Sequence, residues 1–175
     1  HRFVYPLPPG LPSEHAAVLM CAGLTVYSAL QRHILKPGMQ VGILGIGGLG
    51  HLAIQFAHAM GCHVTALSSS PGKEQQARVF GAYSFLLSSD KSAMRAAVYS
   101  QDLIICTANA GIPWGSLFNS MKKRGQLILL GFPDLAFNST DLVAHELSIT
   151  GSLIGTPILM REMLSFVQEH PITPM

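Results

Sequence analysis

A glycine turn between an apolar run and a helix-like stretch constrains the fold of this chain more than any other feature. Residues 39–44 form a short, continuous apolar run of the kind that becomes a buried parallel strand. The pattern G-x-G-x-x-G follows at once, and residues 51–60 then carry apolar side chains at helical spacing. In this strand–turn–helix context the glycine pattern predicts a dinucleotide-binding site.

Each glycine of the pattern has its own physical role. Gly45 allows the tight turn, Gly47 lets the backbone approach a pyrophosphate, and Gly50 lets the helix pack close to the strand. The free N–H groups and the positive end of the helix dipole would then face the phosphates. A turn that serves packing alone is the alternative. The candidate cofactor contacts of this turn are Gly45, Ile46, Gly47, Gly48, Leu49 and Gly50.

Strand-like and helix-like segments alternate along the rest of the chain, which predicts an α/β fold. We expect a Rossmann-type, doubly wound, six-stranded parallel sheet with helices on both faces. The expected strands cover residues 39–44, 63–67, 83–87, 102–106, 125–130 and 146–150. The expected helices cover residues 15–20, 25–34, 51–60, 74–80, 91–99, 113–123 and 158–169, with Ser13 as the first N-cap.

Composition limits the domain organisation and the partners. The chain has 175 residues, and its charged fraction of 11% is well below the usual ~25%. This suggests one domain whose surface is normally covered in part by another domain. We therefore assign residues 1–12 to a proline-rich linker, 13–170 to the nucleotide-binding domain, and 171–175 to a severed link to an absent catalytic domain.

Charge and cysteine usage exclude several classes of partner. The net charge of +2 is too small to indicate a nucleic-acid partner, and we expect the basic residues 122–124 to be a solvated helix end. The chain has no uninterrupted apolar run of 18 residues, so no membrane-spanning helix is expected. The three cysteines lack the spacing of a disulfide framework, which favours reduced thiols and a cytoplasmic location.

The loop after the second expected strand indicates which dinucleotide binds. NAD sites carry an acidic residue about 20 residues beyond the glycine turn, where it binds the ribose 2′-hydroxyl. Here that position is Ser68, and no acidic residue lies between Gly50 and Lys73. Serine hydroxyls and a lysine suit a 2′-phosphate, so NADP(H) is favoured, although an ordinary polar turn is the alternative. The candidate contacts are Ser68, Ser69, Ser70 and Lys73.

Three motifs together resemble a known family. Residues 21–28, 45–51 and 68–73 resemble, in order and spacing, the zinc-dependent medium-chain alcohol dehydrogenases, most closely the cinnamyl-alcohol-dehydrogenase-like branch. The resemblance implies that Ser68, Ser69 and Lys73 bind the 2′-phosphate of NADP(H). It also implies that Cys21 is a ligand of the catalytic Zn²⁺, together with a Cys and a His from the other domain, since such a metal acts as a Lewis acid on the substrate oxygen.

The resemblance and the fold add further candidate contacts. Thr25 matches a family residue beside the nicotinamide, and Ser152, Leu153 and Ile154 match a segment that lies along it. Thr107 and Gly131 follow the fourth and fifth expected strands, where cofactor contacts collect. Without the family, Cys21 in an apolar run would more often be a buried core cysteine.

The chain also departs from the family pattern. It holds no Gly-His-Glu ligand motif and no four-cysteine structural zinc loop. Cys106 stands where Asp is common in this branch, and we expect it to be a core residue. We expect His51, at the start of the fingerprint helix, to be neutral, because the helix dipole disfavours an imidazolium there.

These observations lead to one functional expectation and two alternatives. We expect the cofactor-binding domain of an NADP(H)-dependent zinc alcohol dehydrogenase or aldehyde reductase, which acts on a small alcohol or aldehyde. The family implies a homodimer formed through the sheet edge near residues 148–154. These 175 residues alone should bind NADPH weakly and show no turnover. The alternatives are a zinc-free quinone or enoyl reductase of the same superfamily and a non-catalytic nucleotide-sensing module.

Overall fold

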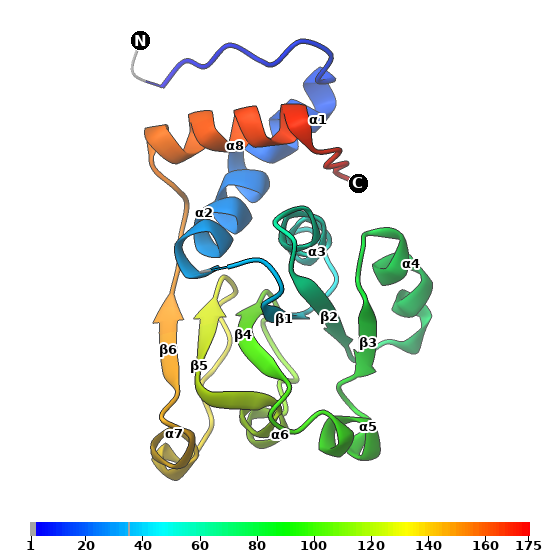
Figure 1. Cartoon of the computed structure of the whole chain (residues 1–175), viewed down its shortest axis with the longest axis vertical. Coiled ribbons are helices and arrows are strands. Elements are labelled where there is room, and N and C mark those ends of the chain that lie inside the picture. The colour runs from blue at the N-terminus through cyan, green and yellow to red at the C-terminus, as the bar shows by residue number, and fades with distance from the viewer. Residues whose placement is uncertain (1–2, 35) are drawn as a thin grey trace.

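The centre of the molecule is a parallel β-sheet. The computed structural model describes residues 3–34 and 36–175 (Figure 1). The strands are β1 (Gln40–Leu44), β2 (His63–Ser68), β3 (Ser84–Leu87), β4 (Gln101–Cys106), β5 (Met121–Leu129) and β6 (Ser148–Gly151). They form one six-stranded sheet in the order β3-β2-β1-β4-β5-β6, with every pairing parallel. This confirms the expected doubly wound sheet, whose strand order reverses between β1 and β4.

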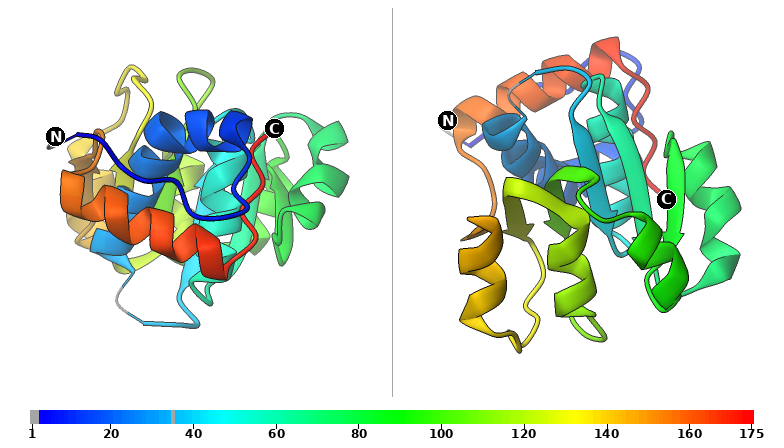
Figure 2. Two further views of the ribbon diagram at one scale, coloured as in Figure 1. Left: turned by 90° about the horizontal axis from the view of Figure 1, so that it is seen from above. Right: turned by 60° about the horizontal axis from the view of Figure 1, so that its bottom comes forward.

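Helices cover both faces of the sheet (Figures 1 and 2). The helices are α1 (Ser13–Val18), α2 (Leu24–His33), α3 (Gly50–Ala59), α4 (Glu74–Val79), α5 (Lys91–Ala96), α6 (Trp114–Ser120), α7 (Ser139–His145) and α8 (Pro157–Glu169). A π-helical turn, η1 (Leu19–Gly23), joins α1 to α2, and a 3₁₀ turn, η2 (Pro71–Lys73), precedes α4. In Figure 1, α2, α3 and α8 lie at the top, and α5, α6 and α7 lie at the bottom.

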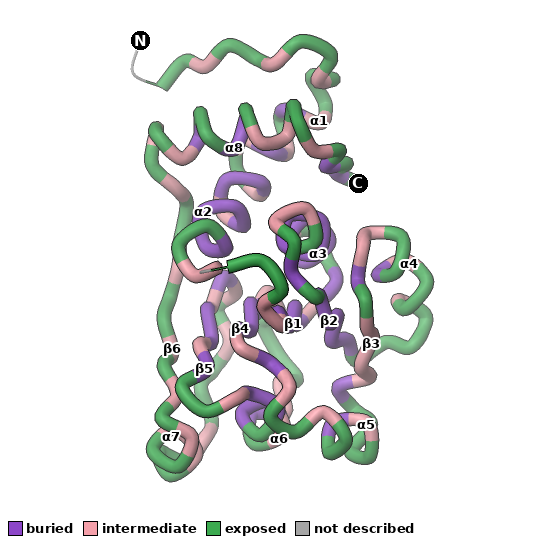
Figure 3. The backbone as a smooth tube through the Cα atoms, in the orientation of Figure 1, coloured by how far each residue is buried: buried purple, intermediate pink, exposed green. Residues whose placement is uncertain are grey.

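The sheet separates two hydrophobic cores because successive strand side chains point to opposite faces. In β4, Ile105 belongs to the core shared with α2, α3 and α8, whereas Ile104 and Cys106 belong to the core shared with α6. All three side chains have an exposed fraction of 0%. Cys106 is therefore a core residue, as expected. Figure 3 shows how the buried segments concentrate on the inner strands and the helices next to them.

An aromatic cluster joins the three helices of the larger core. The ring of Tyr27 on α2 lies 5.6 Å from that of Phe56 on α3 and 5.6 Å from that of Phe166 on α8, measured between centroids. Phe56 and Phe166 are 5.9 Å apart. Edge-to-face and tilted contacts of this kind stabilise a core by about 0.5–1.5 kcal/mol per pair beyond their buried area. The cluster fixes α2 and α8 against the helix that follows the glycine turn.

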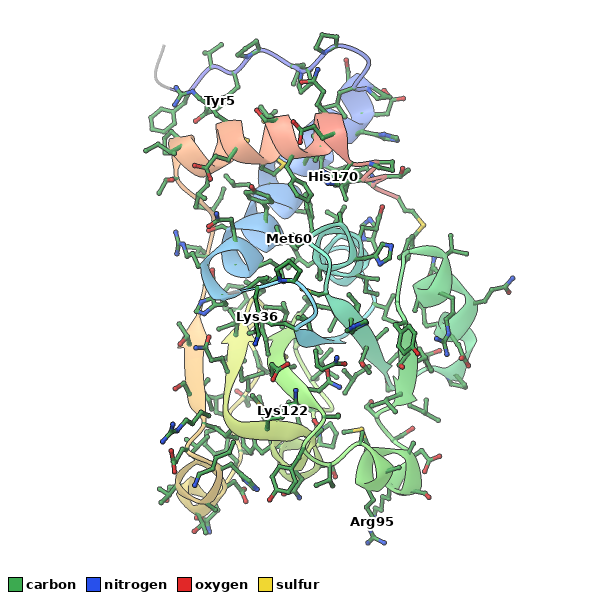
Figure 4. All side chains as sticks on the ribbon, viewed as in Figure 1. Tyr5, Lys36, Met60, Arg95, Lys122 and His170 are labelled. Atoms are coloured by element: carbon green, nitrogen blue, oxygen red, sulfur yellow. The ribbon has the colours of Figure 1, made fainter. Side chains whose placement is uncertain are left out.

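The basic segment 122–124 is not a helix end, which corrects the sequence-based expectation. It is part of β5, where Lys122 Nζ lies 2.8 Å from the carboxylate of Asp102 on β4 (Figure 4). Lys123 and Arg124 both pair with Glu146, each at 2.8 Å. Helical spacing in the sequence could not reveal these partners, because the acids that fix this segment lie about twenty residues away on either side.

Other differences concern helix ends and one missed helix. Ser13 begins α1 and does not cap it, since Pro12 is the N-cap residue. The helix α5 ends at Ala96 and not at Tyr99, which has a positive φ of 54°. Glu146 also has a positive φ, 53°, so β6 starts later than expected. The helix α7 was not expected, and the side chain of Asn138 caps it by accepting from Thr140 N–H at 3.0 Å.

Both terminal segments pack against the domain. The first two residues of the predicted linker 1–12 lie outside the described residues, and the rest of it runs along α8, where Arg161 lies 5.6 Å from the centre of the Tyr5 ring (Figure 4). In the predicted link 171–175, Thr173 exchanges two hydrogen bonds with Gln55 of α3, at 2.8 and 3.0 Å. The domain boundaries themselves stay predictions. No helix in the described ranges is long and apolar enough to cross a membrane.

Candidate functional site

The glycine turn connects β1 to α3 with two close contacts that only glycine permits. Gly45 has a φ of +94°, and a Cβ there would lie 2.8 Å from Thr107 Oγ1. A Cβ at Gly50 would lie 1.8 Å from the carbonyl oxygen of Gly45. This is the tight helix–strand packing predicted for the first and last glycines of the pattern.

The middle of the turn is open. A Cβ built on Gly47 or Gly48 would meet no heavy atom of the described chain within 4 Å. In contrast, the side chains of Ile46 and Leu49 pack into the larger core, and Ile46 is only 7% exposed. The turn is thus anchored by its two apolar side chains, while the backbone of the two glycines faces free space. A ligand at this turn would contact mainly N–H groups.

A cavity of about 400 Å³, the fingerprint cavity, lies at the glycine turn and brings together three segments that the sequence analysis named separately. Its lining includes eight predicted contacts: Gly45, Ile46, Gly47, Ser68, Ser69, Ser70, Lys73 and Thr107. It also includes Ser88 and residues 108–112, which the sequence analysis missed. The position of the missed residues just after β3 and β4, at the carboxyl edge of the sheet, could have indicated them.

The serine loop gives this cavity its electrostatic character. Lys73 is the one charged side chain among the lining residues, and it lies 3.3 Å from Gln76 Oε1. No carboxylate belongs to the described lining. Ser68 is 7% exposed, and its Oγ accepts a hydrogen bond from Ser70 N–H at 3.1 Å, which shapes the start of the loop. The cavity therefore offers hydroxyl groups and a single positive charge.

Thr107 and Gly131 hold loops together at the same edge of the sheet. Thr107 Oγ1 donates to the carbonyl oxygens of Leu44 and Gly45, both at 3.1 Å, so it fixes the beginning of the turn. A Cβ at Gly131 would lie 2.7 Å from both Ala108 O and Asn109 Oδ1. Asn109 Oδ1 also accepts from Phe132 N–H at 2.8 Å, which joins the loops after β4 and β5.

The segment after β6 lines a second cavity. Gly131, Ser152 and Leu153 line this space, which measures about 410 Å³ and is separate from the fingerprint cavity. Leu153 is 70% exposed and Ile154 is 51% exposed. Two large apolar side chains therefore face outward at the carboxyl edge of the sheet. The structure brings Gly131 together with Ser152 and Leu153, but these residues and Ile154 do not line the cavity of the serine loop.

Cys21 lies on the π-helical turn η1 and lines neither of these two cavities. Its side chain is exposed, so the reading of this residue as a buried core cysteine is wrong. Thr25 Oγ1 donates to the carbonyl of Cys21 at 2.9 Å, one helical turn further on. Short π-helical turns occur often at functional sites. No group of three His, Cys, Asp or Glu side chains gathers within the described ranges, so a zinc site with three protein ligands would need at least one ligand from outside them.

His51 connects the glycine turn to the C-terminal segment. Its ring is 3% exposed. Its Nδ1 lies 3.0 Å from the carbonyl oxygen of Gly47, and its Nε2 accepts from Met175 N–H at 3.1 Å. These two bonds require a proton on Nδ1 and a lone pair on Nε2, which is the neutral imidazole that the sequence analysis expected.

A family comparison identifies the chain. Residues 48–169 match the model of the family described as "Zinc-binding dehydrogenase". The chain belongs to this family. It is 42% identical over 176 residues to a probable mannitol dehydrogenase of Fragaria ananassa, covering 98% of this chain and 49% of that protein. The chain therefore spans about half the length of the curated relatives it matches.

Solved structures agree with this assignment. A cinnamyl alcohol dehydrogenase from Sorghum bicolor superposes with a TM-score of 0.92 at 38% identity, covering 98% of this chain and 50% of that one. A structure of CAD from Helicobacter pylori complexed with NADP(H) superposes with a TM-score of 0.88 at 29% identity, covering 99% of this chain and 50% of that one. The expected resemblance to the cinnamyl-alcohol-dehydrogenase branch is thereby confirmed.

Proposed function

We propose that this chain is the NADP(H)-binding domain of a zinc-dependent alcohol dehydrogenase or aldehyde reductase. One observation carries the proposal: a single cavity combines the open glycine backbone with a serine loop whose one charged lining residue is Lys73. A dinucleotide with a 2′-phosphate in addition to its pyrophosphate suits such a lining, because hydroxyl groups and a lysine can bind the additional anionic group. The residues present thus fit NADP(H).

The choice of NADP(H) over NAD(H) rests on the chain's own residues. Solved structures similar to this chain include one complex with NADP(H) and one with NAD, so similarity alone does not decide. The position where an acid would bind a free 2′-hydroxyl is Ser68, and no carboxylate joins it in the described lining. A 2′-phosphate therefore meets hydroxyl groups and Lys73 without like-charge repulsion.

In the proposed complex each candidate residue has a defined task. The N–H groups of Gly47, Gly48 and Leu49 face the pyrophosphate at the start of α3. Ser68, Ser69, Ser70 and Lys73 hold the 2′-phosphate, and Thr107 and Gly131 keep the surrounding loops in place. Thr25, Ser152, Leu153 and Ile154 lie beside the nicotinamide.

The exposed thiol of Cys21 would supply one zinc ligand. When bound, the cofactor exchanges a hydride with a carbonyl carbon, and zinc polarises the substrate oxygen. Since no zinc-binding group of three side chains gathers in the described ranges, the remaining ligands would come from the catalytic domain.

The proposal includes the partners of the whole protein. Its substrate is a small alcohol or aldehyde, and its location is cytoplasmic, in keeping with three unpaired cysteines. We also propose a homodimer through the edge strand β6, whose Ser148, Thr150 and Gly151 are exposed. Sedimentation at high protein concentration tests the dimer, and a strict monomer would contradict it.

Titration of the purified protein with NADPH and NADH tests the cofactor assignment. We expect NADPH to bind more tightly. Ser68→Asp should weaken NADPH on the order of a few kcal/mol more than NADH, because a like charge beside the phosphate is unfavourable. An aspartate can still accept from Ser70 N–H, so the loop should keep its shape. The matched control is Ser89→Asp, which adds the same charge at an exposed residue outside the cavity lining. Equal weakening of both cofactors by Ser68→Asp would refute the assignment.

Zinc analysis separates the zinc enzyme from a metal-free quinone or enoyl reductase of the same superfamily. In the whole protein, Cys21→Ser should lower the bound zinc and abolish alcohol oxidation while NADPH binding is retained. An active whole protein without zinc would instead favour the reductase.

A further inference from the structure

Ser88 is the one described residue of the fingerprint cavity that comes from the loop after the third strand of the sheet. It follows β3 directly, and its exposed fraction is 9%. Its backbone N–H donates to the carbonyl oxygen of Ser68 at 2.8 Å. Ser88 is therefore held next to the residue that stands where NAD sites carry their acid, and it lines the same cavity.

The hydroxyl group of Ser88 has no hydrogen-bond partner within the described residues. The other buried hydroxyl of this cavity, that of Ser68, already accepts from Ser70 N–H. Ser88 Oγ is not among the buried polar atoms that lack a partner in the described residues, which are Ser28 Oγ and Gln101 Oε1, so it is reachable from the cavity. A polar group open to a cavity usually binds a water molecule or a ligand. Because Ser88 lines a polar cavity, an acceptor brought by a ligand could satisfy it.

We infer that Ser88 is a specificity-determining residue that donates a hydrogen bond to the ribose 2′-phosphate of NADP(H). This inference rests on the proposed function and adds a residue to it. Ser69 and Ser70 are exposed members of a loop, whereas Ser88 is attached to the end of a strand by its own backbone bond. A donor fixed in this way loses little conformational freedom when the phosphate binds.

The position of charges around Ser88 supports a phosphate as the acceptor. Lys73 lines the same cavity and supplies its one positive charge. The nearest acid in sequence, Asp90, does not belong to the lining, and its Oδ1 accepts from Ser92 N–H and Ala93 N–H at 2.8 and 3.2 Å. That carboxylate caps α5.

The test compares NADPH and NADH binding in purified Ser88→Ala. Removing one donor to a charged acceptor should raise the Kd for NADPH about tenfold. The Kd for NADH, which lacks the 2′-phosphate, should change less than about twofold by the same reasoning. Ser88→Thr keeps the hydroxyl group and should restore NADPH binding. The matched control is Ser89→Ala, an exposed neighbour outside the cavity lining, which should change neither Kd.

Each outcome decides something specific. If Ser88→Ala weakens NADPH and NADH equally, or weakens neither, the inference on Ser88 is overturned, while a wild-type preference for NADPH leaves the proposed function standing. If the wild-type protein prefers NADH, the proposed function itself fails. Should Ser88→Ala unfold, Ser88→Cys replaces it, because the thiol keeps the volume of the side chain but is a weak donor; unchanged NADPH binding by that variant would also overturn the inference.

Discussion

Replacing Gly50 by alanine should destabilise the glycine turn through a packing clash, and comparison with Gly47→Ala should separate the role of packing from that of ligand binding. The new Cβ would lie 1.8 Å from the carbonyl oxygen of Gly45 and 2.8 Å from its carbonyl carbon. These are backbone atoms, so they cannot rotate away as the end of a flexible side chain could. The start of α3 must shift relative to β1, and the strain appears in the free energy of unfolding.

The size of the effect follows from two opposing contributions. Overpacking of a close contact costs roughly 1–3 kcal/mol, and a backbone contact belongs at the upper end of this range. Alanine gains at most about 1 kcal/mol over glycine from helix propensity. We therefore expect the unfolding free energy of Gly50→Ala to fall by about 2 kcal/mol, as measured by urea denaturation with a two-state fit.

Gly47→Ala is the matched variant with the opposite expectation. Its Cβ would enter space that the described residues leave open, and Gly47 is not among the glycines with a positive φ. Its stability should stay within about 0.5 kcal/mol of wild type. NADPH affinity should nevertheless fall about tenfold or more, a loss of at least ~1.4 kcal/mol, because the methyl group occupies the approach to the phosphates.

Two results would refute this reasoning. If Gly50→Ala is as stable as the wild-type protein, the contact between the start of α3 and Gly45 is not tight. If Gly47→Ala binds NADPH as tightly as the wild-type protein, no phosphate approaches the turn at this residue. Isothermal titration on the same samples used for denaturation gives both quantities.

Three further predictions concern other parts of the domain. Hydrogen bonds from Lys123 and Arg124 lower the pKa of Glu146 to about 2. These ion pairs should therefore stabilise the folded state above the ordinary pKa of a glutamate, and this stabilisation should be lost as the pH falls toward 2. An NMR titration of the Glu146 carboxyl should show the low midpoint, and a normal midpoint would contradict the pairing. Cys21 is exposed, whereas burial raises the pKa of the Cys106 thiol. A thiol reagent should therefore label Cys21 in the native protein and Cys106 only after unfolding, and mass spectrometry can identify the labelled residues. Phe118→Ala, at a residue with no exposed surface, should reduce the unfolding free energy by about 3–5 kcal/mol in denaturant titrations, and a loss below ~1 kcal/mol would mean that the smaller core collapses around the gap.

The sequence predicted the sheet well because strand patterns and glycine turns are local. The apolar run before Gly45 and the serine loop after Ser68 can be recognised within a few residues, and both were found where the structure has them. Parallel pairing then follows from the alternation of strands and helices. In contrast, the extended form of residues 122–124 depends on pairing with β4 and on ion pairs to distant acids, which no local pattern shows.

The candidate site was only partly predictable for the same reason. The sequence indicated Ser68 and Lys73 because NAD sites have a known spacing between glycine turn and acid. It did not indicate Ser88, whose place in the cavity depends on the register of β2 with β3. It suggested two readings for Cys21, and the structure overturned the one based on burial. Exposure of a single side chain on a π-helical turn cannot be read from apolar composition.

The aromatic contact between Tyr27 and Phe56 acts as a fixed spacer in the molecule. Cys21 comes just before α2, and the glycine turn comes just before α3, so the separation of thiol and turn is set by how these two helices pack. Loops at the carboxyl edge can therefore change length or composition without altering that separation. A substitution deep in the core, at Tyr27 or Phe56, would alter that separation without changing the identity of any surface residue.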